Sequence, residues 1–376
     1  ITDMQTENAG AYTCLVNMEG VASTIETLPA NISVRLKPVV IAPSDDNGVV
    51  SGLFSRQFSA ENGVTKFKIS KLPPGVTFNT TTGVLSGRPS KAGIYTLTIT
   101  ATNLAGDSEP YTYQWEIEDF PLAARGNWRA TIQRTNLNSS LGGRFSLTIS
   151  KTGTYSGKLI LGAKSYSLSS RINAVPGNQA STTPFSISRG KSITPLTGTI
   201  TLKLDDGTLT GSITDNSFSA DLTGVRNPWT TATPAVPALM VFNTALERPD
   251  SVTDNPLFPQ GNGYVIHKLS PTGTISSAGR LAEGTSFTFS SHMGPSGQLP
   301  VHALLYDKTG SIQGDSTIER ASELVAGSLS WFKIQQSSKS TTRSHQSGIP
   351  LHSLNVRGSR YIKPSGMIIG LDTPLT

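Results

Sequence analysis

Short runs of alternating apolar and polar residues, separated by turns, constrain this chain more than any other feature of its sequence. The clearest run covers residues 94–102, where Tyr95, Leu97, Ile99 and Ala101 share one side and Ile94, Thr96, Thr98 and Thr100 lie on the other. Successive side chains of a strand point to opposite faces, so this run predicts a strand with one buried face. Similar runs recur through most of the 376 residues and predict an all-β chain.

The composition agrees with many short strands. Hydrophobic residues make up 36% and charged residues 15% of the chain, whereas globular proteins average roughly 45–50% and 25%. The 36 glycines and 23 prolines supply turns between strands. No apolar run approaches the ~18 residues of a membrane-spanning helix. No signal peptide is visible, and we expect the native N-terminus to lie upstream of Ile1.

Residues 1–36 contain the segment TENAGAYTCLVNMEG. It resembles the late strands of an immunoglobulin domain of the intermediate type, and 1–36 would then be the C-terminal part of such a domain. The resemblance implies that Tyr12 forms a tyrosine corner and that Cys14 is the second cysteine of the bridge between the sheets. The first cysteine would lie upstream, because Cys14 is the only cysteine here. Such a bridge implies an oxidising compartment. The alternative is a buried structural thiol.

Residues 37–120 predict a second β-sandwich. In LPPGVTFNTTTGVLSGRPSKAGIYTLTITATNLAG, the Pro73–Gly75 and Thr82-Gly83 segments are turn signals between short strands. The segment resembles the putative-Ig (cadherin-like) modules that occur in tandem in large bacterial surface proteins. The resemblance implies a spacer or adhesive module.

Residues 121–376 predict an internally duplicated antiparallel β-meander or barrel region, with halves at 121–235 and 236–376. SKTGTYSGKLILGAKSYSLSS (150–170) matches SPTGTISSAGRLAEGTSFTFSS (270–291), which aligns Gly153 with Gly273. LKLDDGTLTGSIT (202–214) matches LLYDKTGSIQGDSTI (304–318). The repeated unit of strands and tight turns favours one closed or nearly closed barrel, or two small ones. We expect a closing strand that continues past Thr376.

This region, including VRNPW, FPQGNGY and GSLSWFK, resembles an uncharacterised β-rich repeat of very large secreted proteins from environmental bacteria. That resemblance implies no activity. An outer-membrane barrel would need an apolar outer band. The outward candidates Lys158, Lys203, Asp205 and Lys268 disfavour one.

Catalytic motifs are missing from the sequence. It contains no GxSxG elbow and no HExxH zinc helix, and its two GDS strings are better interpreted as polar turns. The five histidines lack metal-ligand spacing with cysteine or carboxylates. A pair of carboxylates brought together by the fold could still cleave a glycosidic bond. We predict that the chain is not an enzyme and has no cofactor, catalytic residue or metal site.

Two sets of residues have a binding interpretation beside a structural one. The acidic turns SDDNG (44–48), DDG (205–207) and TDN (214–216) could hold calcium, but Asp and Asn are ordinary turn residues. Trp128, Trp229 and Trp331 recur at roughly repeat spacing. They are interpreted as core anchors, with stacking on sugars as the alternative.

The charge of +6 is concentrated between Leu324 and Leu371, where there is no acidic residue. This span predicts weak, salt-sensitive binding to polyanions, with no specific nucleic-acid binding; a solvated loop that binds nothing is the alternative. The candidate residues are Lys333, Lys339, Arg343, Arg357, Arg360 and Lys363.

The sequence as a whole predicts a non-catalytic secreted or cell-surface modular protein that serves adhesion, acts as a stalk or provides a binding scaffold. A carbohydrate-binding accessory region of a larger secreted enzyme is the alternative. Expected partners are extracellular polysaccharides or other surface proteins, and no membrane span is expected in this chain.

Overall fold

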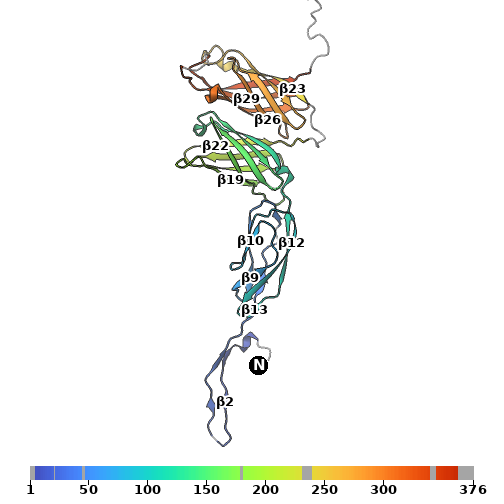
Figure 1. Cartoon of the computed structure of the whole chain (residues 1–376), viewed down its shortest axis with the longest axis vertical. Helices are drawn as coiled ribbons and strands as arrows, with labels where there is room; N and C mark the ends of the chain where they lie inside the picture. The colour runs from blue at the N-terminus through green and yellow to red at the C-terminus, as the bar shows by residue number, and fades with distance from the viewer. Residues whose placement is uncertain are drawn as a thin grey trace, which may run out of the picture. The chain divides into compact units, whose positions relative to one another are not determined.

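The computed structural model describes residues 5–20, 22–44, 47–177, 181–230, 239–338 and 344–362. The chain divides into one unit at Ile1–Asp119 and another at Phe120–Thr376 (Figure 1). Throughout the described parts, the regular elements are strands and 3-10 helices of three residues. None of the described helices is long and apolar enough to cross a membrane. The all-β prediction is confirmed.

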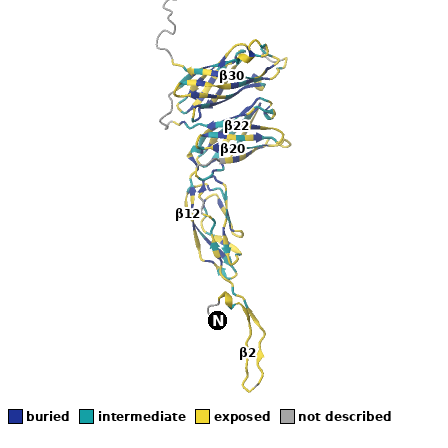
Figure 2. Ribbon diagram, turned by 180° about the vertical axis from the view of Figure 1, so that it is seen from behind, coloured by how far each residue is buried: buried dark blue, intermediate teal, exposed yellow. Residues whose placement is uncertain are grey.

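The start of the first unit is a narrow antiparallel ribbon. β1 (Gly10–Tyr12) pairs with β4 (Ala30–Ile32), and β2 (Leu15–Val16) pairs with β3 (Ile25–Glu26). The described side chains of these strands are exposed or half-buried, as the yellow colouring of the ribbon in Figure 2 shows. The Tyr12 hydroxyl donates to the backbone oxygen of Asn8 at 2.8 Å, which is the bond of a tyrosine corner. Cys14 is a free, exposed thiol, so the buried-thiol alternative is wrong.

The rest of the first unit is a sandwich. One sheet has the order β10 (Val76–Asn79), β11 (Val84–Gly87), β7 (Phe54–Gln57). In the other, β12 (Gly93–Asn103) pairs with β14 (Tyr111–Glu118), β13 (Gly106–Asp107) and β9 (Lys66–Ile69), and β14 pairs in parallel with β6 (Gly48–Val49). A short pair joins β5 (Val39–Ile41) to β8 (Ser59–Glu61).

The face predicted for the long strand β12 is correct. Leu97, Ile99 and Ala101 are fully buried, whereas Ile94 on the opposite face is 72% exposed. The turn at Gly83 also matches its prediction, because Gly83 has a φ of +75° and a Cβ there would lie 2.5 Å from the Phe58 carbonyl oxygen.

The second unit begins with eight antiparallel strands that we call the first barrel. Strands that are consecutive in the chain pair with each other, and the first strand pairs with the last. The exception is the fourth and fifth strands, which are the two ends of the sheet and meet at a seam. The strands are β15 (Gly126–Ile132), β16 (Gly143–Ile149), β17 (Thr154–Leu161), β18 (Lys164–Arg171), β19 (Ser181–Ile187), β20 (Leu196–Lys203), β21 (Thr208–Thr214) and β22 (Ser219–Arg226).

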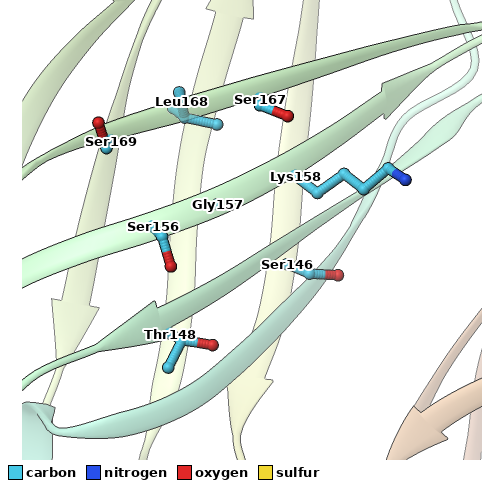
Figure 3. Close-up of a pocket in the computed structure, with 8 residues that line it drawn as sticks. All are labelled: Ser146, Thr148, Ser156, Gly157, Lys158, Ser167, Leu168 and Ser169. Atoms are coloured by element: carbon cyan, nitrogen blue, oxygen red, sulfur yellow. The ribbon is translucent and has the colours of Figure 1, made fainter.

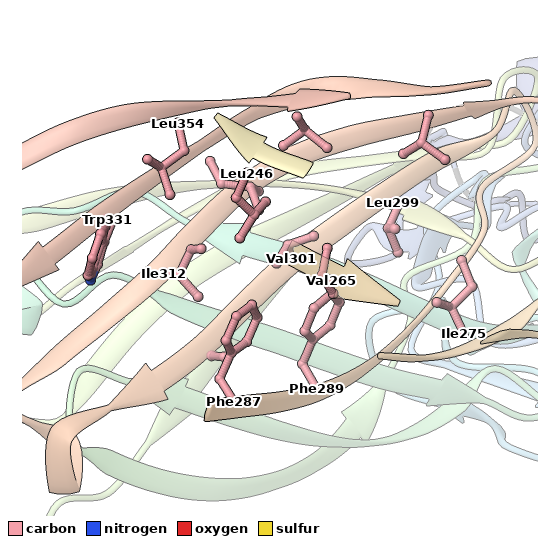
Figure 4. Packing of buried hydrophobic residues seen from close by; sticks show 14 of the residues in the cluster. Leu246, Val265, Ile275, Phe287, Phe289, Leu299, Val301, Ile312, Trp331 and Leu354 are labelled. Atoms are coloured by element: carbon pink, nitrogen blue, oxygen red, sulfur yellow. The ribbon is translucent and has the colours of Figure 1, made fainter. Parts of the chain in front are cut away.

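Eight further strands form the second barrel with the same order, closure and seam. Its interior is filled by aromatic and branched side chains, including Phe287, Phe289 and Trp331 (Figure 4). The strands are β23 (Met240–Glu247), β24 (Gly263–Leu269), β25 (Thr274–Arg280), β26 (Ser286–His292), β27 (Gln298–Leu305), β28 (Gly310–Glu319), β29 (Leu324–Lys333) and β30 (Ile349–Arg360). Residues 320–323 form the turn between β28 and β29.

The strand registers of the two barrels define equivalent positions. Leu147, Gly157 and Leu168 form one rung across β16, β17 and β18, and the corresponding rung of the second barrel is His267, Ser277 and Phe289. This agrees with the alignment of Gly153 to Gly273. Continuing around each barrel pairs several further residues of the same type. They are Gly143 with Gly263, Pro184 with Pro300, Gly198 with Gly314, Gly211 with Gly327, and Gly224 with Gly358.

The second alignment predicted from sequence is wrong by one hairpin. Residues 205–207 turn between β20 and β21, whereas the matched turn at 306–309 joins β27 to β28. The equivalent of β21 is β29. Both turns contain Asp and precede an alternating strand, which explains why the letters match without equivalent topology. The boundary proposed at residues 235 and 236 lies outside the described residues.

Candidate functional site

Each barrel carries a hollow on the outer face of its second, third and fourth strands. The first hollow, on β16–β18, has a volume of about 630 Å³ (Figure 3). Hydroxyl side chains and one ammonium group project from its strands. Its lining residues are Ser146, Thr148, Ser156, Gly157, Lys158, Ser167, Leu168 and Ser169.

The second hollow, on β24–β26, also has a volume of about 630 Å³. Its lining residues are Ile266, Lys268, Ser276, Ser277, Ala278, Thr288, Phe289 and Ser290, together with Arg144 from the first barrel. Apart from Arg144, the strand registers place these eight residues at the same eight positions as the lining of the first hollow. The hollow is therefore a property of the duplicated unit.

Short side chains explain why the outer face is hollow at this place. Ser146, Ser156 and Ser167 alternate with less exposed residues along three neighbouring strands, so they point outward and fill little space. Gly157 faces inward, where a Cβ would lie 2.8 Å from the Leu147 side chain and 3.1 Å from the Leu168 side chain. The glycine therefore lets β16 and β18 bring their leucines together beneath the hollow.

The chemistry of both hollows is cationic and hydrogen-bonding. In the first hollow, five hydroxyl groups and the exposed Lys158 ammonium are available, and the lining includes no acidic residue. The second hollow has Lys268 and Arg144 as cations beside the apolar Ile266 and Phe289. Burial lowers the pKa of Arg144 from 12.5, but the guanidinium remains protonated at neutral pH. These groups suit a hydroxyl-rich ligand that carries acidic groups.

Sequence reasoning missed the hollows as sites. Lys158 and Lys268 entered it only as charges that disfavour a membrane barrel. The alignment of 150–170 with 270–291 already places Ser156 opposite Ser276 and Ser167 opposite Thr288, and this repeated run of outward hydroxyls was the signal that could have identified them.

The described residues of the predicted basic span do not form one free cationic surface. Lys333 is buried, with its Nζ donating to the Ser344 carbonyl oxygen at 2.6 Å and lying 4.6 Å from the centre of the Tyr306 ring. Burial lowers the pKa of Lys333. The prediction of a surface role for Lys333 is therefore wrong. Lys333 continues the alternating series of buried residues on β29 that includes Trp331, which places its side chain at the end of the barrel interior.

Arg357 and Arg360 are placed beside acids that the linear span does not contain. Arg357 lies 3.7 Å from the carboxylate of Glu247 on β23, and Arg360 pairs with Glu323 in the turn before β29. Pairing of β30 with its neighbours supplies these charges. Lys339, Arg343 and Lys363 lie outside the described residues, and their part of the prediction stays untested.

The tryptophans are core residues, so the sugar-stacking alternative is wrong. Trp128, Trp229 and Trp331 are 1%, 8% and 1% exposed. Each indole N–H donates to a buried acceptor: the Ala124 carbonyl at 2.9 Å, the Met293 carbonyl at 3.0 Å and the Tyr306 hydroxyl at 3.0 Å. They are not at equivalent positions, however, because Trp128 corresponds to Phe242 and Trp331 lies on β29.

The acidic turns have ordinary turn chemistry where they are described. Asp206 accepts from the backbone N–H of Thr208 at 2.9 Å, and Asp215 accepts from the backbone of Phe218 at 3.0 Å. The Thr208 hydroxyl, which donates to Asp206 at 2.6 Å, and then the backbone bond lower the pKa of Asp206, and the backbone bond from Phe218 lowers that of Asp215. In the described part of the chain, no group of three or more His, Cys, Asp or Glu side chains could hold a metal ion. Asp45 and Asp46 lie outside it.

Comparison with known proteins identifies one module. Residues 37–118 match the family described as "Putative Ig domain". Residues 37–118 form an immunoglobulin-like domain. Its Tyr95 hydroxyl donates to the Lys91 carbonyl oxygen at 3.1 Å, in the same four-residue relation as at Tyr12.

A stretch of 117 residues, 30% of this chain, is 27% identical to the "Serine-rich adhesin for platelets" of Staphylococcus aureus. The same adhesin from strain MRSA252 is 26% identical over 117 residues. The chain spans 4% and 8% of the lengths of these relatives. Together with the immunoglobulin-like domain, this similarity supports a modular surface protein of bacterial type.

Similarity to solved structures is weak. Transferrin-binding protein B from Haemophilus parasuis aligns over 95% of this chain and 87% of its own at 9% identity, with a TM-score of 0.19. The same protein from Neisseria meningitidis aligns over 94% and 84% at 9% identity, with a TM-score of 0.21. A lectin from Aleuria aurantia aligns over 73% and 93% at 12% identity, with a TM-score of 0.16. TM-scores this low carry no argument about fold or function.

Proposed function

We propose that this chain belongs to a non-catalytic secreted or cell-surface protein for adhesion, in which immunoglobulin-like modules act as spacers and the barrels bind extracellular polysaccharide. The observation that carries the proposal is the repetition of one hollow at eight equivalent positions in both barrels. A feature of packing alone would not require outward hydroxyls and a cation in both copies.

The proposed ligand is a polysaccharide that carries carboxylate or sulfate groups. Hydroxyls of Ser156, Ser167 and Ser169 can donate to and accept from sugar hydroxyls, while Lys158 attracts an acidic group. In the second hollow Lys268 and Arg144 supply the positive charge. Because the serine hydroxyls and the two lysines are exposed, affinity depends on several weak contacts and is screened by salt, whose Debye length is about 8 Å at 0.15 M.

Binding of the full chain to polygalacturonate and heparin, with uncharged dextran as comparison, tests the proposal. We expect binding to the two acidic polymers at low salt that weakens as salt rises. Replacing Lys158→Ser or Lys268→Ser should weaken it by about fivefold each, the effect of roughly 1 kcal/mol per exposed charge contact. Lys203→Ser, an exposed lysine on β20 outside both hollows, is the matched control. Equal loss in the control, or no binding to either acidic polymer, contradicts the proposal.

The carbohydrate-binding accessory region of a secreted enzyme remains the second candidate, supported by the five hydroxyls of the first hollow. Binding of the chain to dextran distinguishes this candidate from charge-based adhesion. Binding to the neutral polymer that survives Lys158→Ser but is lost in a Ser156→Val and Ser167→Val double variant would favour the accessory role over charge-based adhesion.

A further inference from the structure

Within the second unit, the two barrels contact each other through different faces. The first barrel contributes the outer side of β22, β15 and β16, which we call the donor face. The second barrel contributes the outer side of β26, β27 and β28, which we call the acceptor face. Gln313 on β28 accepts from the Gly143 N–H at 3.0 Å and donates to the Ile132 carbonyl oxygen at 2.8 Å. His292 and His302 are buried at the same contact.

Arginines dominate the donor face. Arg134, which follows β15, donates to the hydroxyl of Ser311 on β28 at 2.6 Å and to the carbonyl oxygen of Ser330 on the neighbouring strand β29 at 3.0 Å. Arg129 donates to the Ser290 carbonyl oxygen, and Arg144 donates to the His302 carbonyl oxygen at 3.4 Å. The acceptor face therefore offers backbone carbonyls and hydroxyls to guanidinium groups.

Because the two barrels are equivalent modules, a contact between unlike faces leaves one copy of each face unused. The unused donor face is on β30, β23 and β24 of the second barrel. It is hollowed, with a volume of about 480 Å³. Tyr264, which takes the position of Arg144, is 52% exposed there. The lining is Asn243, Thr244, Ala245, Gly263, Tyr264, Val265, Ile266, Arg357, Gly358 and Ser359.

The unused acceptor face is on β18, β19 and β20 of the first barrel. Pro184 and Ser186 on β19 are exposed, whereas their equivalents Pro300 and His302 are buried under the first barrel. Pro300 and His302 on β27 would be exposed in the same way as Pro184 and Ser186 if the first barrel did not cover them.

The two unused faces are complementary in the same way as the two faces of the internal contact, because one supplies hydrogen-bond donors and the other supplies acceptors. Asn243 and Tyr264 replace Arg129 and Arg144 and keep a side-chain donor at each position, while Arg357 adds a guanidinium on β30. On the other face, Ser169 is equivalent to Ser290 and Ser186 to His302, so the backbone acceptors are retained.

We propose that the free donor face of the second barrel binds the free acceptor face of the first barrel in a second copy of this chain, head to tail, in the manner of the internal barrel contact. This goes beyond the proposed function and does not depend on the ligand of the hollows. In such a pair, Tyr264 of one copy lies beside the first hollow of the other copy. This is the same relation that Arg144 has to the second hollow within one chain. Because the contact is heterologous, repeating it builds either a closed ring or an open chain, and in both cases the assemblies grow with concentration.

Sedimentation velocity of the full chain over a range of concentrations, with two variants, tests the proposal. Tyr264→Glu places a charge on the donor face, and Ser186→Arg places a bulky charge on the acceptor face. We expect wild type to form dimers and longer species, and each variant alone to associate at least about tenfold more weakly, as expected for an unpaired charge at an interface. Mixing the two variants should restore a one-to-one dimer and nothing longer, because each retains one intact face.

Ser353→Glu on β30 and Thr210→Arg on β21 are the matched controls, since both positions are exposed and the equivalents of both, Ser219 and Ala326, are exposed as well. They should associate like wild type. Far-UV circular dichroism establishes that all four variants are folded. A wild-type chain that stays monomeric at every concentration, or folded variants whose mixture does not dimerise, overturns the proposal.

Discussion

The side-chain oxygen of Gln313 in the second barrel accepts a hydrogen bond from the backbone N–H of Gly143 in the first, 170 residues away, at 3.0 Å. The amide nitrogen of the same side chain donates to the Ile132 carbonyl oxygen at 2.8 Å. One buried amide therefore joins the ends of β15 and β16 to β28. This bond pair links two barrels that each have a complete core of their own.

Gln313→Ala should destabilise the second unit by about 1–3 kcal/mol, because it leaves the buried N–H of Gly143 and the carbonyl of Ile132 without their partner. Urea unfolding of the full chain, read by hydrogen exchange in peptides from β15, β16 and β28, measures the change. Thr210→Ala, on an exposed face of β21, should change stability by less than about 0.5 kcal/mol. Equal effects of the two substitutions would show that the amide does not join the barrels.

Gly142→Ala should be more harmful in the wild type than in the Gln313→Ala variant. Gly142 has a φ of +67°, and a Cβ there would lie 1.9 Å from the Gln313 Oε1 atom. The left-handed backbone costs about 1–2 kcal/mol in either background, whereas the clash disappears once the glutamine is removed. A double-mutant cycle should therefore give a coupling of about 1–3 kcal/mol. Strict additivity would mean that the two residues are not in contact.

The fold class could be predicted from the sequence because the period-two alternation of apolar and polar residues directly indicates which side of a strand is buried. The prediction for Leu97 and Ile99 needed only neighbouring residues. The equivalence of the barrels needed more. Strings such as those at 205–207 and 306–309 look alike because Asp is common in turns, and only the pairing register shows that they belong to different hairpins.

The candidate site was harder to predict for the same reason. Whether Arg357 is a free cation depends on Glu247, which is more than 100 positions away and becomes its neighbour only through pairing of β23 with β30. The hollows depend on which side of β17 faces out and on Arg144 reaching across from another barrel. Neither fact is local in the chain.

Lys333→Met should leave binding to polygalacturonate and heparin unchanged within about twofold, in contrast to what the linear charge distribution predicts. The Nζ atom is held by the Ser344 carbonyl oxygen and lies over the Tyr306 ring, so it is not available to a polymer. Affinity measurements beside Lys158→Met, which should bind more weakly, check this. A loss with Lys333→Met as large as with Lys158→Met would restore the surface role of Lys333.

The second unit should lose stability as the pH falls from about 6.5 toward 4, because three of its histidines are buried in the neutral form. Desolvation by burial lowers the pKa of His267 and His292 to about 4 and that of His302 to about 3. Nearby positive charge acts in the same direction, from Arg129 on His292 and from Arg144 on His302.

The unfolded chain, with histidine pKa values near 6.5, binds more protons than the folded chain throughout this interval. Stability from these histidines is therefore complete above pH 6.5 and is lost as the pH falls, by about 1.4 kcal/mol per pH unit for each histidine. His292→Asn and His302→Gln should each flatten this slope, even where they lower stability at pH 7. Urea unfolding at a series of pH values, read by hydrogen exchange in β26 and β27, measures the slope. Slopes that are the same in the variants and in the wild type would mean that other groups take up the protons.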